Sequence, residues 1–103
     1  MAKFKHTQDI SYVDFTKTIT VFCPLGNDYY TADINVRFYP NQWMMDYIDV
    51  EKYIMSLQGS RNIIEDIATS VYDYLNKEYS PNKVRVSIYA YNAAHFPVTV
   101  VKE

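Results

Sequence analysis

Alternating hydrophobic and polar residues predict four β-strands in this chain. Successive side chains of a strand point to opposite faces, so a period of two indicates a half-buried strand. This alternation runs through residues 16–22, 29–39, 84–91 and 96–101. The second run is the clearest, because its hydrophobic side chains share one face and its polar ones share the other. An antiparallel strand with one polar face typically has this pattern. The hydrophobic set is Tyr30, Ala32, Ile34, Val36 and Phe38.

Two helices are predicted between the second and third strands. Hydrophobic residues recur at helical spacing over residues 46–57 and 61–79, and Asp46 is the expected N-cap of the first helix. The order ββααββ predicts an α+β fold, with both helices on one face of a four-stranded antiparallel sheet. Residues 1–14 show no sustained period. We therefore expect a flexible N-terminal arm over residues 1–14 and a single domain over residues 15–103.

Composition and charge narrow the classes of function. Ten Lys and Arg against twelve Asp and Glu give a net charge of -2, which offers no general attraction for nucleic acid or anionic lipid. Cys23 is the single cysteine, so an internal disulfide is excluded, and the two histidines give no metal-ligand spacing. No hydrophobic run approaches the roughly 18 residues of a membrane span, so we expect a cytoplasmic protein without a membrane partner. Because 103 residues bury a modest core, a homo-oligomer is also expected.

Aromatic and apolar side chains outside the predicted core point to contacts between subunits. Several of the eleven tyrosines fall on the polar sheet face, where an apolar ring with a hydroxyl tip suits an interface. The apolar cluster Trp43-Met44-Met45 precedes the first predicted helix. We interpret this cluster as core or subunit contact.

Two short motifs and their spacing resemble the 7-cyano-7-deazaguanine reductase (QueF-type) family of tunnelling-fold proteins. The chain has Phe-Cys-Pro at 22–24, a turn and a strand, and then Phe-Tyr-Pro-Asn at 38–41. The spacing from Cys23 to Pro40, and onward to Glu65, fits the family pattern without a gap. The resemblance implies a tunnelling fold (T-fold) that oligomerises into a barrel. It also implies a QueF-like enzyme of the queuosine and archaeosine pathways.

The resemblance assigns a nucleophile and a substrate-binding residue. Cys23 would attack the nitrile of 7-cyano-7-deazaguanine to form a covalent thioimide. The alternative is a buried structural cysteine at a strand end. Glu65 would accept hydrogen bonds from the edge of a purine-like ring. Alternatively, Asn62 and Glu65 form a capping box that starts the second helix.

The chain differs from the family pattern at the two positions where the family has residues that transfer protons. The position of the family's proton-donating aspartate is Tyr30, so Asp28, two residues earlier, is the catalytic carboxylate that we predict. The position of a family histidine is Ile64, which transfers no proton. His95 would replace it if subunits bring it to Cys23, but an exposed loop histidine is the simpler interpretation.

The segment that corresponds to the family's NADPH-binding stretch reads Asp46-Tyr47-Ile48-Asp49 and lacks its lysine. Because a cofactor phosphate normally binds Arg or Lys, no cofactor is expected, although NADPH serves the parental reaction. Nitrile reduction and cofactor-free amidine formation on a modified nucleoside both remain open. Two other functions also remain open. One is a catalytically degenerate T-fold that binds a purine- or pterin-like ring, and the other is a purely structural assembly protein. The substrate would be a free base or a base in nucleic acid, which Lys17, Lys83 and Arg85 would contact as a small local cluster of positive charge. A solvated strand face is the simpler interpretation of these three residues.

Overall fold

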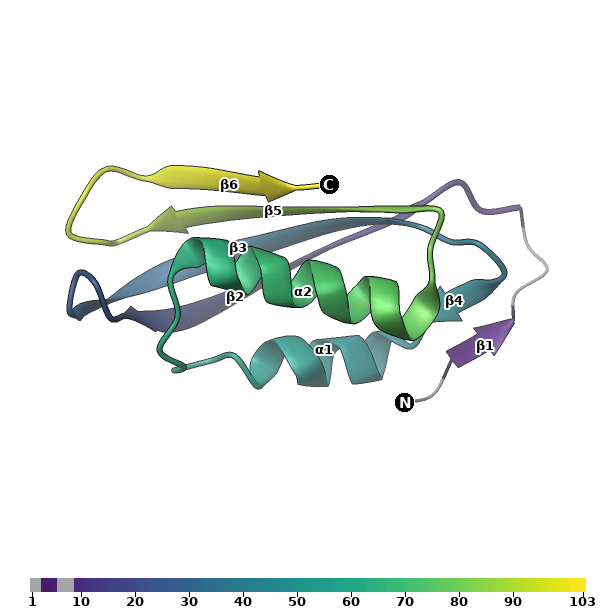
Figure 1. Ribbon diagram of the computed structural model, residues 1–103, viewed down its shortest axis with the longest axis horizontal. Helices are drawn as coiled ribbons and strands as arrows, with labels where there is room; N and C mark the ends of the chain where they lie inside the picture. The colour runs from purple at the N-terminus through teal and green to yellow at the C-terminus, as the bar shows by residue number, and fades with distance from the viewer. Residues whose placement is uncertain (1–2, 6–8) are drawn as a thin grey trace.

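A four-stranded antiparallel sheet forms one layer of the protein and two helices form the other (Figure 1). The computed structural model describes residues 3–5 and 9–103. The sheet has the strand order β2-β3-β5-β6, and a separate two-stranded sheet pairs β1 with β4. The elements are β1 (Lys3–Lys5), β2 (Val13–Cys23), β3 (Asp28–Tyr39), β4 (Trp43–Met45), α1 (Tyr47–Met55), α2 (Ile64–Tyr79), β5 (Lys83–Tyr91) and β6 (Val98–Lys102).

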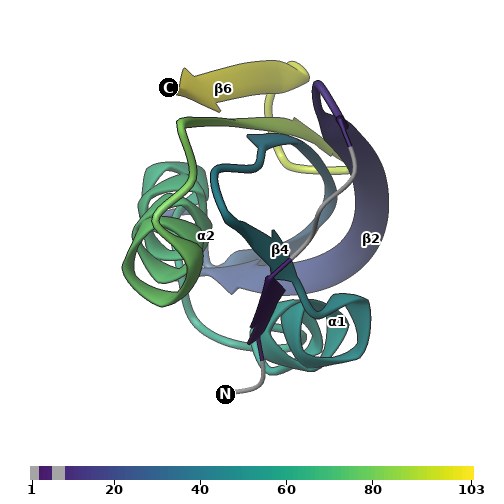
Figure 2. The ribbon, with the colours of Figure 1, turned by 90° about the vertical axis from the view of Figure 1, so that its right-hand side faces the viewer.

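Both helices lie on the same side of the curved sheet, as Figure 2 shows. The hydrophobic residues of β3 that the alternation placed on one face are buried there, and the alternate residues of β5 are buried with them. Helix α2 covers this face with Ile67, Ala68, Val71, Leu75 and Tyr79. The α+β architecture and the placement of both helices are therefore confirmed. Within the described residues, neither helix is long and apolar enough to cross a membrane.

The N-terminal segment takes a larger part in the fold than the flexible arm that we predicted. Strand β2 begins at Val13 instead of Thr16, because β3 is long enough to pair with the extra residues. Asp14 pairs with Arg37 in this register, and the Arg37 Nε donates to the Asp14 carboxylate at 2.9 Å. Strand β1 pairs with β4. The predicted arm also includes residues 1–2 and 6–8, which lie outside the described residues.

Strand β4 explains the apolar cluster that precedes the first helix. Met44 and Met45 are buried in the core, and Trp43 is half-buried. The interpretation of this cluster as core is therefore confirmed for both methionines. Period-two alternation did not reveal β4, because three consecutive apolar residues have no polar face.

Helix α1 begins where the sequence predicted, and α2 begins later. The Asp46 side chain caps α1 by accepting hydrogen bonds from the backbone N–H groups of Ile48 and Asp49 at 3.0 and 3.1 Å. Helix α2 has Ile63 as its N-cap and no side-chain capping bond. The capping box of Asn62 and Glu65 is therefore wrong.

The segment between the helices explains this late start, because it pairs with the outer edge of β2. The Gly59 N–H donates to the Thr20 carbonyl at 2.7 Å, and the Phe22 N–H donates to the Ser60 carbonyl at 2.8 Å. The Asn62 N–H then donates to the Phe22 carbonyl at 3.0 Å. Residues 60–62 are thus held along the outer edge of the strand, which keeps them out of the helix.

Lys17, Lys83 and Arg85 do not form one basic cluster. Lys17 lies on the helix side of β2, where it pairs with Glu51 at 3.4 Å. Lys83 and Arg85 lie on the polar face of the sheet, and both pair with Glu103, at 3.8 and 3.4 Å. The three cations therefore point to opposite faces of the sheet, and each has a carboxylate partner.

Candidate functional site

The turn between β2 and β3, the beginning of α2 and the loop between β5 and β6 meet at one end of the molecule, at the left of Figure 1. Side chains from these three segments surround a pocket of about 520 Å³. Ligand pockets in proteins have volumes of about 300 to 1,000 Å³. The pocket is lined by Cys23, Asp28, Glu65 and His95, among others. The structure therefore brings together all three predicted site residues, Cys23, Asp28 and Glu65, and also His95.

Cys23 is the last residue of β2 and is half-buried at the pocket wall. The chain leaves the strand through Pro24, and Asn27 completes the turn in the left-handed conformation with a φ of 53°. The turn directs the Gly26 N–H toward Cys23 Sγ at 3.4 Å. A backbone donor on the sulfur stabilises negative charge there. The cysteine is thus accessible to a ligand and faces a polar group.

Asp28 lies directly across the hairpin from Cys23, because the two residues are register partners. Side chains of such partners share one face of an antiparallel pair. The exposed Asp28 carboxylate accepts the N–H of Tyr29 at 2.7 Å, which holds it beside the turn. A carboxylate therefore lies next to the thiol, although it is not in the register of the family's aspartate.

Tyr30 occupies that register position, and its hydroxyl connects two parts of the site. The side chain is only 3% exposed, and its hydroxyl donates to the Asn62 carbonyl at 2.8 Å. Burial raises the pKa of Tyr30 well above its ordinary value of 10, and the neighbouring charges of Cys23 and Glu65 raise it further. The hydroxyl therefore keeps its proton at neutral pH. It fixes the hairpin that carries Cys23 against the segment that leads to Glu65.

Glu65 is the second residue of α2 and is exposed at the pocket. The N-terminal end of a helix carries a partial positive charge, which favours a carboxylate in the first turn. Ile64, beside it, is half-buried and lines the pocket as an apolar wall. The pocket thus combines an apolar surface with one carboxylate at the helix end.

His95 belongs to the loop between β5 and β6. The side chain is exposed, as the simpler interpretation expected, but it also lines the pocket that contains Cys23. The pairing of the strands is the signal from which the position of His95 at the pocket could have been predicted. Tyr91, at the end of β5, pairs with Thr31, near the beginning of β3, so the β5–β6 loop lies beside the β2–β3 turn.

Three large apolar residues line the same pocket and are strongly exposed. Leu25 is 82% exposed, Phe96 77% and Tyr29 54%. The alternation placed Phe96 at the beginning of the last strand, but β6 begins at Val98 and leaves Phe96 in the loop at the pocket. Leu25 lies in the turn after Cys23, where no period predicts the direction of a side chain. Exposed apolar side chains around a pocket typically contact a ligand or another protein chain.

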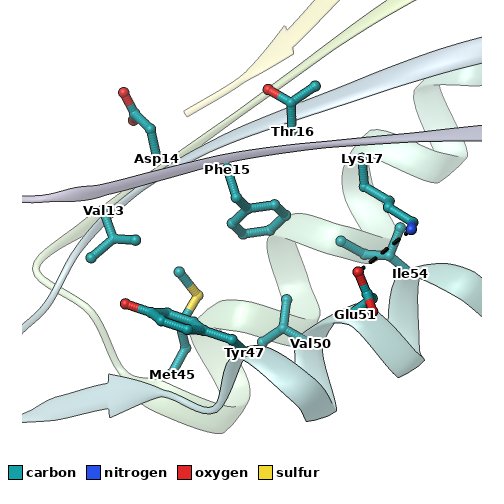
Figure 3. Close-up of a pocket in the computed structure, with 10 residues that line it drawn as sticks. All are labelled: Val13, Asp14, Phe15, Thr16, Lys17, Met45, Tyr47, Val50, Glu51 and Ile54. Carbon is teal, nitrogen blue, oxygen red and sulfur yellow. Dashed lines mark hydrogen bonds and ion pairs between the residues drawn. The ribbon is translucent and has the colours of Figure 1, made fainter.

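A second groove lies between β2 and α1, with a volume of about 420 Å³ (Figure 3). Apolar side chains such as Phe15, Met45 and Val50 form its floor, and Tyr47 of the candidate NADPH-binding stretch lies at its side. Lys17 is the one cation among its lining residues, and the carboxylate of Glu51 already pairs with it. These residues do not fit a cofactor phosphate, which needs an available cation.

The main pocket contains side-chain types that bind metal ions in other proteins. Within residues 3–5 and 9–103, no three His, Cys, Asp or Glu side chains lie close enough together to hold a metal ion. Cys23, Asp28, Glu65 and His95 therefore do not form such a group.

Comparison with known proteins places this arrangement in a known fold. No protein-family model and no curated protein sequence matches the chain. Among solved structures, the chain is similar to the archaeosine synthase QueF-Like in its apo form, with a TM-score of 0.81 and 20% sequence identity. The match covers 92% of this chain and 94% of that one. The protein therefore has the fold of the QueF-like tunnelling-fold proteins.

Proposed function

We propose that this protein is a QueF-like enzyme that acts on the nitrile of a 7-cyano-7-deazaguanine substrate through Cys23. The observation that carries the proposal is that Cys23 and Glu65 line one pocket of about 520 Å³, together with Asp28. The fold similarity to an archaeosine synthase supports the same class of substrate. Glu65 would accept hydrogen bonds from the donor edge of the deazaguanine ring, and this would direct the nitrile toward Cys23.

The reaction begins with attack of the Cys23 thiolate on the nitrile carbon. The sulfur–carbon bond forms, the carbon–nitrogen triple bond becomes a double bond, and the nitrogen takes up one proton to give a thioimide. Ammonia would then add to the thioimide carbon, and the thiol would leave, so that an amidine is produced. We favour this cofactor-free route over reduction, because the β2–α1 groove offers no available cation for NADPH. Asp28, across the hairpin from Cys23, would remain close to the reacting nitrogen.

The first test is intact-protein mass spectrometry after incubation with 7-cyano-7-deazaguanine. Wild type should gain the mass of one substrate and an absorbance of a thioimide, whereas Cys23→Ala should gain neither. Because the chain has one cysteine, the site of an adduct is unambiguous. Absence of an adduct in wild type would contradict the proposal.

Glu65→Gln tests recognition separately from chemistry. Loss of charge-assisted hydrogen bonds costs about 1.5 to 3 kcal/mol, so substrate should bind about 10- to 150-fold more weakly. Asp66→Asn is the matched control, because it removes a carboxylate from the same helical turn that is not among the pocket-lining residues. Equal effects of both substitutions would show that general charge, and not Glu65, attracts the substrate.

A non-catalytic binding module is the second candidate function. It is favoured by Tyr30 and Ile64, since a buried hydroxyl with a raised pKa and an aliphatic side chain replace two proton-transferring residues of the family. In that case purines or pterins would stabilise the protein against heat without forming an adduct. If the protein forms no adduct and no ring compound stabilises it, the result would indicate a structural assembly protein.

We also propose that the protein assembles into a homo-oligomeric barrel. Strands β2 and β6 form the two edges of the sheet, and an edge strand readily pairs with another chain. The α1–α2 segment covers the outer edge of β2 near Thr20 and Phe22, so the first half of β2 is the part that would pair with a neighbouring β6. The exposed Leu25, Tyr29 and Phe96 would then be covered at the subunit contact. A stable monomer by light scattering at micromolar concentration would exclude this assembly.

A further inference from the structure

The loop between β5 and β6 is attached to the sheet at its beginning. Asn92 adopts the left-handed conformation with a φ of 57°, and its side-chain amide donates to the Thr31 hydroxyl at 3.4 Å. Ala93 packs against the hydrophobic core and also lines the pocket. These contacts hold the beginning of the loop at the pocket, and His95, further along the loop, lines the pocket together with Cys23.

The orientation of the His95 ring is set by two contacts. Nδ1 lies 2.7 Å from the Phe96 carbonyl oxygen. A carbonyl accepts hydrogen bonds and does not donate them, so Nδ1 carries a hydrogen. The Phe96 ring meets the imidazole edge to face, with a centroid distance of 5.7 Å. In the neutral ring, Nε2 therefore has the free lone pair, which is the atom that a base requires.

We propose that His95 is the proton carrier for Cys23. This role rests on the proposed nitrile chemistry and adds a catalytic residue to it. His95 Nε2 takes the proton from Cys23 Sγ and gives it to the nitrile nitrogen as the sulfur–carbon bond forms. The imidazole returns to its neutral form, so the step consumes no proton and needs no oxidant or reductant.

The other titratable groups of the pocket are less suited to this transfer. Tyr30 is buried, has a raised pKa and donates its hydroxyl hydrogen to the Asn62 carbonyl. One carboxylate oxygen of Asp28 accepts the Tyr29 N–H. Imidazole is the side chain that both accepts and donates protons near neutral pH. The titratable groups that line the pocket are Cys23 from β2, Asp28, Tyr29 and Tyr30 from β3, Glu65 from α2, and His95.

The experiment measures the reactivity of Cys23 twice in each variant. The first measurement is the rate of alkylation by iodoacetamide from pH 5 to pH 9, followed by mass spectrometry, which needs no nitrile substrate. The second is the rate of adduct formation with 7-cyano-7-deazaguanine. The variants are His95→Asn and His95→Gln, and His6→Gln controls for loss of a histidine elsewhere in the sequence.

In wild type and His6→Gln, the alkylation rate should rise in a step that depends on His95 within the range from pH 5 to pH 9. Both His95 variants should lose this step and alkylate about tenfold more slowly at pH 7, and adduct formation should fall about 100-fold, the lower end of the range for general acid–base catalysis. The substrate affinity should stay within about twofold of wild type, because Glu65, not His95, is proposed to hold the ring. Unchanged thermal midpoints would confirm that the variants fold.

Three other outcomes would each overturn part of the proposal. Identical alkylation profiles in wild type and the His95 variants would show that the two side chains exchange no proton. A His95-dependent profile without any adduct in wild type would establish the proton transfer and reject the nitrile chemistry. Adduct formation at the wild-type rate in both His95 variants would retain the nitrile chemistry and reject His95 as its proton carrier.

Discussion

Tyr30 stands at the position where the QueF-type family has its proton-donating aspartate. Its buried hydroxyl, however, makes a hydrogen bond that holds two segments of the fold together. Replacement by Phe separates these two roles, because it removes the oxygen and keeps the ring in the core. The hydroxyl donates to the Asn62 carbonyl at 2.8 Å, and the side chain is 3% exposed. We expect Tyr30→Phe to lower stability and to leave the reactivity of Cys23 nearly unchanged.

The expected size of the stability loss follows from this one hydrogen bond. A typical intramolecular hydrogen bond contributes about 1 kcal/mol, and an acceptor left unpaired in a buried site raises the cost to about 3 kcal/mol. For 103 residues the entropy of unfolding is about 0.2 kcal/mol/K, so each 1 kcal/mol lowers the melting temperature by about 5 °C. Because Asn62 is half-buried, we expect a loss of about 1 to 2 kcal/mol, or about 5 to 10 °C.

Tyr53→Phe is the matched control. The Tyr53 hydroxyl also donates to a backbone carbonyl, that of Ser70, at 3.2 Å, and it lies between the two helices. The two substitutions should therefore have similar effects on thermal and denaturant unfolding. Only Tyr30→Phe changes a residue that lines the pocket.

The chemical measurement is the rate at which Cys23 forms an adduct with 7-cyano-7-deazaguanine. A general acid accelerates a reaction by about 100-fold or more, so loss of a true proton donor would be obvious. We expect both Tyr variants to react within about threefold of wild type, far from that effect. A fall of about 100-fold in Tyr30→Phe alone, with little loss of stability, would refute the structural interpretation.

Three further predictions concern the fold. Asp46→Ala should cost about 1 kcal/mol in urea unfolding, because two N–H groups of the first turn of α1 lose their acceptor; a cost near zero would show that water replaces the cap. Ser80 ends α2 in the left-handed conformation with a φ of 46°, so Ser80→Gly should raise stability by about 0.5 to 1 kcal/mol, and a lower melting temperature would contradict this. The hydrogen bond from Arg37 holds the pKa of Asp14 below its ordinary value of 3.8. The contribution of this pair to stability is therefore fully present above that value and lost as the pH falls through the lowered pKa. The stability difference between wild type and Arg37→Gln should be constant from pH 5 to 7 and shrink below about pH 4; a constant difference down to pH 2 would contradict it.

The sequence by itself determined the secondary structure and the layers of this protein. Alternation in residues 29–39 and helical spacing in residues 61–79 are both set by the burial of one face, so they directly predict which face joins the core. Asp46 was found as an N-cap because that bond forms between residues two and three positions apart. Short spacing also placed Cys23 and Asp28 on the same hairpin.

Tertiary structure alone decided where α2 begins and which residues share the pocket. Backbone hydrogen bonds from residues 59–62 hold this segment along the edge of β2, and no local pattern reveals such a contact between distant parts of the chain. His95 lies 72 positions after Cys23 in the sequence, and only the pairing of β5 with β3 brings its loop to the same pocket. Periodicity reports the direction of a side chain relative to its own strand or helix. The approach of two loops depends on the register of the strands that carry them, and here that register assembles the candidate site.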